Sequence, residues 1–509
     1  MHDCLKIPEL VDQIFSNFTA EYYGGDAKVL ARLGRTCRLF HDPAMDVLWR
    51  EPQKFAQHLA IGPTWRKRSV RLLRPIVPGD WDRALVYTRR VKSFAFPSLS
   101  EVSLSEIFPA LSQCLPLGCV FPNLTHLSWY PRREADFPYI QLFISPTITS
   151  ISISSMPASC TVLLPTLPLE CRVLKKISID LIGHAFRDMG GCFPAFLHQL
   201  ETVEHLSMLL PDAASLVHVG RIETLRFLYL PALPLHVLPR SVEPASLFLN
   251  LSTLIVGSVD IEPATNIMAM CIDSTFQSLR FTLETCPTAE VMDKFYTALT
   301  RCRRSHASLR SLGVCSVADD EPALVQDPRY LLRRHTIQRL FCFAQLTEIE
   351  IESACGFELD DGICNQMARA WPHAERLTLK EFYNPVKQSV TLESLHSFAQ
   401  HCPALNRLHL TFDARVFPGP HSSAQTAAGI SQLKLEQLHV GYSLINAYNP
   451  RPVAKFIGDL FPNLQYLATA RNDSYRDPDS YESDDDMPDY HSWQEVEERL
   501  PGRIRMWGR

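Results

Sequence analysis

Apolar residues recur along most of the chain in one short pattern, apolar-x-x-apolar-x-apolar. Residues 124–129 show it as Leu124-x-x-Leu127-x-Trp129, and residues 346–351 as Leu346-x-x-Ile349-x-Ile351. About fourteen units follow one another at a mean spacing of about 29 residues, which is typical of a solenoid built from repeats. Their first anchors are Val91, Leu124, Ile148, Leu174, Val203, Ile222, Leu251, Phe276, Leu309, Leu346, Ala374, Leu405, Leu435 and Leu464.

Each unit is expected to supply one short strand and one helix. Because residues two apart in a strand share a face, the last two anchors of a unit point into the same core. Segments with helical spacing lie between the strands, as in residues 392–402, where Leu392, Leu395 and Phe398 share one side. Proline removes a backbone donor and biases the residue before it to extended geometry, so several helices are expected to stop at one. These stops are Phe121-Pro122, Trp371-Pro372, Cys402-Pro403 and Phe461-Pro462.

The units resemble leucine-rich repeats of the helix-containing type over residues 91–470. The resemblance implies an α/β solenoid, an irregular leucine-rich-repeat horseshoe. It is irregular because the spacings vary from about 19 to about 37 residues, and because the Asn or Cys that the family places after the strand is mostly missing. The alternative is an ordinary α/β domain in which the spacing is coincidental.

The start of the chain has a different pattern, that of three short helices. Ile7-Pro8 opens the first helix with proline in its first turn, where the lost N–H is harmless. The second follows Gly24-Gly25 and carries Leu30, Leu33 and Cys37 on one face. Asp42-Pro43 is expected to be the N-cap and first residue of the third, which ends at Trp49. Three such helices bury little surface alone, so a neighbour is expected.

Residues 1–55 resemble an F-box. The matching features are the Ile-Pro-Glu-Leu start (7–10), the Leu30/Leu33 pair, Cys37-Arg38 with Phe40, and the PAMDVLW stretch (43–49), which is most similar to F-box-like proteins of mushroom-forming fungi. The resemblance implies docking to a Skp-type linker subunit, and through it to a cullin. Carried over by position, the docking residues are Pro8, Leu10, Ile14, Leu33 and Cys37. The alternative is that these side chains pack the module itself.

The remaining segments of the chain are delimited by their composition and by one capping motif. Residues 56–90 are expected to form a helical linker, and residues 471–491 an acidic disordered loop that buries too little surface to offset its ordering entropy. Ser480 and Ser483 in that loop are possible phosphorylation sites. The capping box Ser492-x-x-Glu495 predicts a closing helix, followed by a strand, over residues 492–509.

Composition and charge narrow the classes of partner. A formal net charge of −5 argues against nucleic-acid binding, which normally needs a basic domain. The uncharged stretch from Phe137 to Leu169 is long enough for a membrane helix, but its prolines predict a strand with turns instead: Pro138, Pro146, Pro157, Pro165 and Pro168. MHDCLKIPEL has no apolar h-region, so no secretory signal is expected and the predicted location is cytoplasmic and/or nuclear.

Motifs for catalysis, phosphate or dinucleotide binding are missing from the sequence. The 15 cysteines are scattered without a CxxC, which argues against zinc. We therefore expect no cofactor, no metal and no enzymatic activity; a hydrolase hidden among the repeats is a minor alternative.

The leucine-rich-repeat resemblance also places the non-anchor strand residues on a concave target-binding face. These are His126, Ser128, Tyr130, Glu223, Arg226, Arg376, Lys380, Arg407, His409 and His439. Each has the alternative of being plain solvated sheet surface. The combined prediction is a substrate-recruiting adaptor of an SCF-type cullin-RING ubiquitin ligase, which binds an unknown protein target. The alternative is a non-catalytic interaction scaffold that is not assembled into a ligase.

Overall fold

The computed structural model describes most of the chain. The described residues are 7–18, 25–51, 77–96, 108–115, 118–131, 133–181, 191–239, 247–316, 327–382, 388–418, 431–446, 448–470 and 488–500. They divide into two compact units, Met1–Leu225 and Arg226–Arg509.

Unit 1 begins with three helices and continues as a parallel sheet. Its strands are β1 Ser93–Phe96, β2 His126–Trp129, β3 Ser150–Met156, β4 Lys176–Leu181 and β5 His205–Ser207, each paired with the next in parallel. Its α-helices are α1 Pro8–Ser16, α2 Gly25–Leu33, α3 Arg38–Arg50, α5 Pro78–Thr88, α6 Phe108–Cys114, α7 Leu167–Glu170, α8 Cys192–Leu197 and α9 Ala213–Gly220. The 3-10 helix η2 Glu134–Phe143 lies between β2 and β3, and the 3-10 helix η3 Ala158–Thr166 precedes α7 between β3 and β4.

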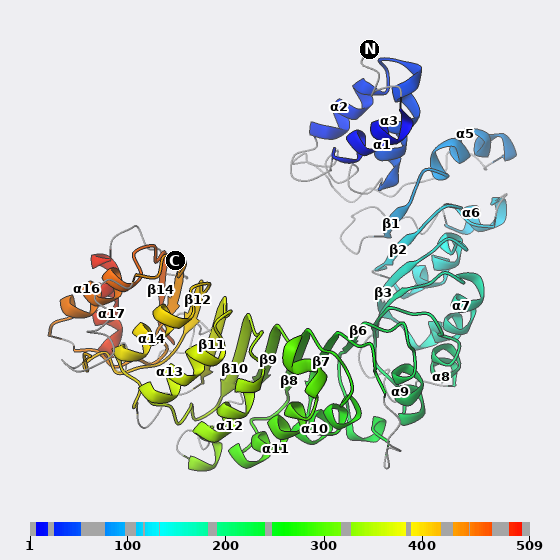
Figure 1. Ribbon diagram of the computed structural model, residues 1–509. Helices are drawn as coiled ribbons and strands as arrows, with labels where there is room; N and C mark the ends of the chain where they lie inside the picture. The colour runs from blue at the N-terminus through cyan, green and yellow to red at the C-terminus, as the bar shows by residue number, and fades with distance from the viewer. Residues whose placement is uncertain are drawn as a thin grey trace. The chain divides into compact units, whose positions relative to one another are not determined.

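Unit 2 is a longer array of the same kind (Figure 1). Its strands are β6 Phe227–Leu230, β7 Thr253–Val259, β8 Ser278–Leu283, β9 Ser311–Ser316, β10 Glu348–Ser353, β11 Arg376–Glu381, β12 Arg407–His409, β13 Gln437–His439 and β14 Tyr466–Ala468, again each parallel to the next. Its α-helices are α10 Ile261–Met270, α11 Ala289–Thr300, α12 Arg334–Gln338, α13 Asp361–Ala370, α14 Leu392–His401, α16 Arg451–Leu460 and α17 Pro488–Arg499. Short 3-10 helices are η5 Leu235–Val237, η6 Arg303–Ala307, η8 Pro328–Tyr330 and η9 Arg339–Cys342.

The α/β solenoid expected from the repeats is confirmed. Strand residues alternate between core and open surface: in β10, Ile349 and Ile351 are buried while Glu348 and Glu350 are only partly covered. Helices cover one side of the strands, with α10 beside α11 and α13 beside α14 (Figure 1). We call the other side of each sheet its open face; it is the face that the sequence predicts as concave.

The predicted stops before proline are confirmed for three helices. α13, α14 and α16 end one residue before Trp371, Cys402 and Phe461, and each of these three is followed by proline. Cys402 also ties its repeat to the preceding one, because its thiol donates to the carbonyls of Ala368 and Trp371, both at 3.5 Å.

The predicted register of one repeat is wrong. The sequence assigns Ile222, Leu225 and Phe227 as its anchors, but β6 pairs with β7 so that Leu228 lies opposite Leu254 and Leu230 opposite Val256. The anchors are therefore Leu225, Leu228 and Leu230, three residues further along the chain. Ile222 is still buried, in the turn before the strand.

Two predicted helix starts are also wrong. α3 begins at Arg38 with Cys37 as its N-cap, so Pro43 lies inside the helix and Cys37 is not part of α2. At the other end, α17 begins at Pro488, which places Ser492 inside the helix rather than at its start. The strand predicted after the closing helix and most of the 56–90 linker lie outside the described residues; α5 occupies the end of that linker.

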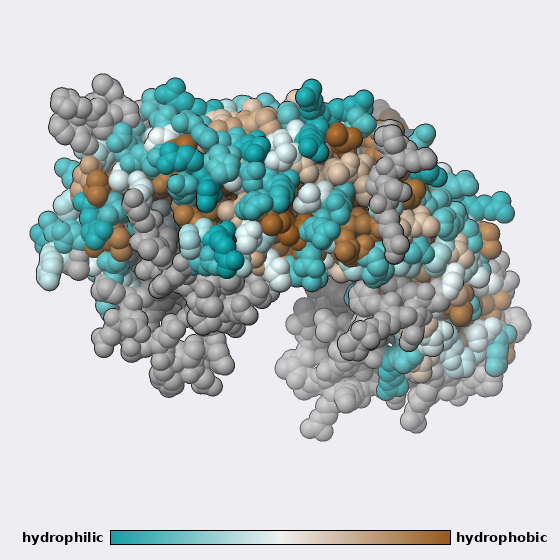
Figure 2. Space-filling view, turned by 90° about the horizontal axis from the view of Figure 1, so that it is seen from below, coloured by the Kyte–Doolittle hydropathy of each residue, from teal (hydrophilic) through white to brown (hydrophobic). Residues whose placement is uncertain are grey.

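Figure 2 views the chain from the side on which α10 to α12 lie. Hydrophilic residues cover most of that face, and hydrophobic residues form separate patches among them. Among the described residues, the helices are all too short or too polar to cross a bilayer.

Candidate functional site

The N-terminal helices form a small closed core with an apolar margin. Val11 and Phe15 of α1 pack against Leu30 of α2 and Ala44 of α3, and all four are buried. This core is the reason for the helical spacing in the sequence, because residues three and four apart share one side of a helix.

A row of apolar residues at the start of α1 and along it lies beside this core without being covered by it. Ile7, Leu10 and Ile14 are 45%, 38% and 42% exposed. At about 100° per residue, Leu10 and Ile14 fall about 40° apart around the helix axis. Ile7 is the N-cap residue that precedes the helix. We call Ile7, Leu10 and Ile14 the α1 stripe.

The predicted docking residues are therefore divided by the structure. Leu10 and Ile14 lie in the α1 stripe, whereas Leu33 is partly buried and packs against the module core. Cys37 is half-buried at the N-cap of α3, where its side chain makes no capping hydrogen bond. Pro8 is in the first turn of α1, as predicted, and its side chain lies outside the described part.

Helix α3 is tied to the segment that leads into β1. Arg90 donates to the carboxylate of Asp42 at 2.7 Å and also pairs with Asp46, while the Lys92 N–H donates to the Arg50 carbonyl at 3.0 Å. The ring of Trp49 lies beside that of Tyr87 of α5, with 4.8 Å between ring centroids and an angle of 41° between the ring planes. The module is thus fixed to the first repeat through α3, and these contacts do not involve α1.

Three of the predicted target-binding residues lie on or beside the open face of β2 in unit 1. His126 and Ser128 are strand residues, and Tyr130 follows the strand with its hydroxyl donating to Ser152 Oγ at 3.0 Å. Glu223 and Arg226 are misplaced by the register error. Both precede β6, and the Arg226 carbonyl accepts hydrogen bonds from Ser252 and Thr253 of the next repeat.

The other predicted residues meet on unit 2. Strand pairing places Arg376 opposite Arg407 and His409 opposite His439, with Lys380 further along β11. They belong to a groove of about 290 Å³ on the open face of β10 to β14, except for Arg376, which lies beside it. The groove is lined by Glu350, Glu352, Thr378, Lys380, Arg407, His409, Gln437, Leu438, His439, Tyr466 and Ala468.

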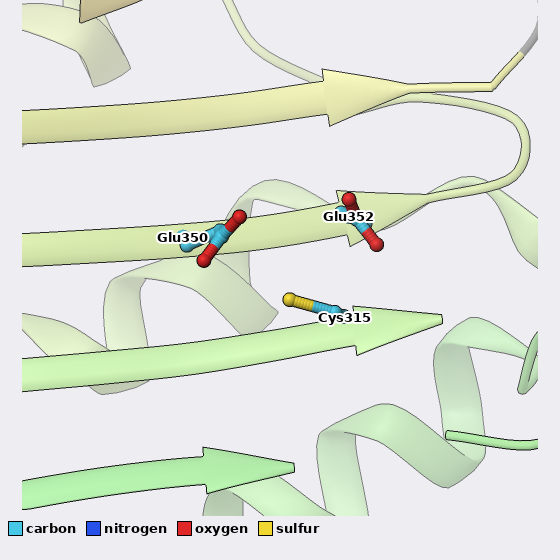
Figure 3. Close-up of side chains that lie close together, drawn as sticks. All are labelled: Cys315, Glu350 and Glu352. Carbon is cyan, nitrogen blue, oxygen red and sulfur yellow. The ribbon is translucent and has the colours of Figure 1, made fainter. Parts of the chain in front are cut away.

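The acidic edge of this groove is a cluster of three side chains on two strands. Cys315 of β9 faces Glu350 and Glu352 of β10 (Figure 3). The Cys315 sulfur and one carboxylate oxygen of each glutamate lie within 4.8 Å of one another. Burial raises the pKa of the Cys315 thiol to about 12, with the two carboxylates adding to the effect. Burial also raises the pKa of Glu352. Two smaller effects lower it: the hydrogen bond that Glu352 accepts from the Ser316 N–H at 2.9 Å, and the Lys380 ammonium at 3.9 Å.

An arginine from two strands away supplies the cation for this cluster. Arg280 of β8 reaches across β9, forms an ion pair with Glu350 and donates to the Cys315 sulfur at 3.8 Å. Gly313 lies between Arg280 and Glu350 in the sheet, and a Cβ there would be 3.2 Å from Arg280 Nε. The glycine therefore gives the arginine room to cross its strand, and the guanidinium occupies the place beside the carboxylates.

Sequence reasoning missed this acidic edge. The rule that selected Arg376 and Arg407 selects Glu348, Glu350 and Glu352 equally well, because the EIEIES stretch alternates over β10. No short sequence spacing links Cys315 and Arg280 to these glutamates, since the two residues come from other strands, β9 and β8. The possible phosphorylation sites Ser480 and Ser483 lie outside the described residues.

Comparison with known proteins adds little to this geometry. No protein-family model and no curated protein sequence matches the chain. Among solved structures, an LRR protein of Leptospira interrogans is similar over 72% of this chain and 90% of its own length, with 14% sequence identity and a TM-score of 0.24. The fold assignment therefore depends on the strand order and register described above and not on this alignment.

Proposed function

We propose that the chain is a non-catalytic, substrate-recruiting adaptor of an SCF-type cullin-RING ubiquitin ligase. Its N-terminal helices dock the Skp-type linker subunit, and the open face of the solenoid binds a protein target. The observation that carries the proposal is the α1 stripe, an apolar margin left exposed next to a closed core. The ubiquitin-transfer chemistry belongs to other subunits, and this chain supplies proximity and orientation.

The stripe has the features of a small, well-placed docking site. Leu10 and Ile14 are among the positions at which the F-box resemblance predicts linker contact, and their side chains already lie at the surface. Fully burying an aliphatic side chain of this size is worth about 1.5 to 3 kcal/mol. The ion pairs between α3 and Arg90, in the segment before β1, do not involve α1, so the linker subunit is accommodated without breaking them.

A binding measurement with the linker subunit tests the proposal. The double variant Leu10→Asp/Ile14→Asp is expected to bind the purified Skp-type subunit at least about tenfold more weakly than the wild type, because two charges must be desolvated at the contact. Isothermal titration calorimetry with the full chain measures this. Both side chains are exposed, so the far-ultraviolet circular dichroism of the variant is expected to match the wild type.

The matched control is Val162→Asp/Leu169→Asp. These residues are 62% and 66% exposed and lie on η3 and α7 of the same unit. Linker affinity is expected to be unchanged in this variant. If the wild type fails to bind the linker, the adaptor proposal is wrong and the interaction scaffold replaces it, since the open face of the solenoid does not depend on the module.

A further inference from the structure

The charges along β10 and its neighbours are balanced pair by pair. Each of the three glutamates of β10 faces a cation on an adjacent or next-adjacent strand, in the pairs Glu348–Arg376, Glu350–Arg280 and Glu352–Lys380. The acidic edge of the groove is thus neutralised by the protein itself.

Arg407 on β12 is the exception. Its side chain is exposed and lines the groove, and in the described part of the chain no carboxylate lies within 4.0 Å of its guanidinium. Its partners across the sheet are Arg376, which is already paired with Glu348, and the neutral Gln437. The groove therefore carries a surplus positive charge at this point.

Beside Arg407 the floor of the groove is a pair of stacked imidazoles. The rings of His409 and His439 are 3.8 Å apart between centroids, at an angle of 26°. The Gly441 N–H donates to His439 Nδ1 at 3.1 Å, which fixes the hydrogen of the neutral ring on Nε2. Arg407 is therefore the exposed cation of this part of the groove, and the two stacked rings form the largely buried floor beside it.

We propose that this half of the groove binds a carboxylate side chain from an extended, Asp/Glu-rich segment of a partner protein. The carboxylate pairs with Arg407, and the neighbouring backbone of the segment lies over the stacked histidines. Charge-assisted bonds from a guanidinium are shorter and stronger than neutral ones, and the walls of a groove reduce their screening by water. The inference deepens the proposed function, since it names the chemistry of the target at the open face.

Selection from a random-peptide library tests the preference without knowledge of the target. The full-length chain, Arg407→Glu and Arg304→Glu are panned in parallel. Arg304 is also an exposed arginine and lies on η6, outside the groove, so its variant matches the change in net charge. Peptides recovered by the wild type and by Arg304→Glu are expected to be enriched in Asp and Glu, and the enrichment is expected to be lost with Arg407→Glu.

Fluorescence anisotropy then measures one recovered peptide beside its copy with Asn and Gln in place of Asp and Glu. At least about tenfold weaker binding is expected both for the amide copy on wild type and for the acidic peptide on Arg407→Glu, which is about 1.4 kcal/mol. Recovery of peptides without acidic enrichment, or equal binding to Arg407→Glu, overturns the proposal. Linker affinity measured on Arg407→Glu is expected to be unchanged, so failure here and failure of the adaptor proposal are distinguished.

Discussion

Replacing Gln432 with alanine is expected to lower the free energy of unfolding by about 4 kcal/mol, because one buried amide there makes four hydrogen bonds. Its Nε2 donates to the carbonyls of Leu405 at 2.7 Å and Cys402 at 3.4 Å, and its Oε1 accepts the N–H groups of Lys434 at 2.8 Å and Leu435 at 2.7 Å. Alanine leaves these groups without the amide and opens a cavity. Urea unfolding followed by circular dichroism measures the loss.

Two further variants show whether the hydrogen bonds, and not side-chain volume, are responsible. Gln432→Glu keeps the size of the side chain but turns a carboxylate oxygen toward the Cys402 and Leu405 carbonyls, so it is expected to destabilise as well. Gln465→Ala removes an exposed glutamine one repeat later and is expected to change stability by less than about 0.5 kcal/mol. A loss below about 1 kcal/mol for Gln432→Ala would contradict the role given to this amide.

Gln432 also shows why the repeats could be predicted from the sequence while the hydrogen bonds between neighbouring repeats could not. The anchors are local in sequence, so Leu435 and Leu438 were assigned to core from spacing alone, and both are buried. Gln432 looks like a polar residue in a loop. Its role depends on the Cys402 carbonyl of the preceding repeat, and no spacing rule connects the two.

The register error at β6 has a similar origin. Residues 222–230 satisfy the anchor pattern twice, once from Ile222 and once from Leu225, and every anchor in either version is apolar. Only the pairing with β7 decides between them. Glu223 and Arg226 were assigned to the open face because that information is not local.

In the N-terminal module, the sequence does not reveal which apolar residues are exposed. Helical spacing places Leu10, Val11, Ile14 and Phe15 on one apolar side of α1, but it does not reveal where the core stops. The structure shows that the core ends at Val11 and Phe15 and leaves the α1 stripe outside. Likewise, the preference of proline for the first turn predicts a helix start at Pro43, although Pro43 lies in the interior of α3.

Stability is also expected to fall as pH rises from about 5 to about 8, through Glu381 at the end of β11. Its carboxylate accepts a hydrogen bond from Thr411 Oγ1 at 2.6 Å, and burial raises its pKa from 4.5 to about 7. Gly441, with a φ of +55°, leaves the space that the Thr411 hydroxyl occupies. Between these two pKa values the folded chain holds a proton that the unfolded chain has released, so rising pH favours unfolding.

The variant Glu381→Gln isolates this contribution, because its amide stays neutral and still accepts from Thr411. It is expected to exceed the wild type by less than about 1 kcal/mol at pH 5 and by about 3 kcal/mol at pH 8, at about 1.4 kcal/mol per pKa unit. Thr411→Val removes the hydroxyl that donates to Glu381, and this hydrogen bond stabilises the ionised carboxylate more than the protonated carboxyl. The variant is therefore expected to lose more stability at pH 8 than at pH 5. Urea unfolding of the three proteins at both pH values measures these differences. Parallel stability curves for wild type and Glu381→Gln would mean that the carboxyl group is hydrated in the folded chain, since burial is what raises its pKa here.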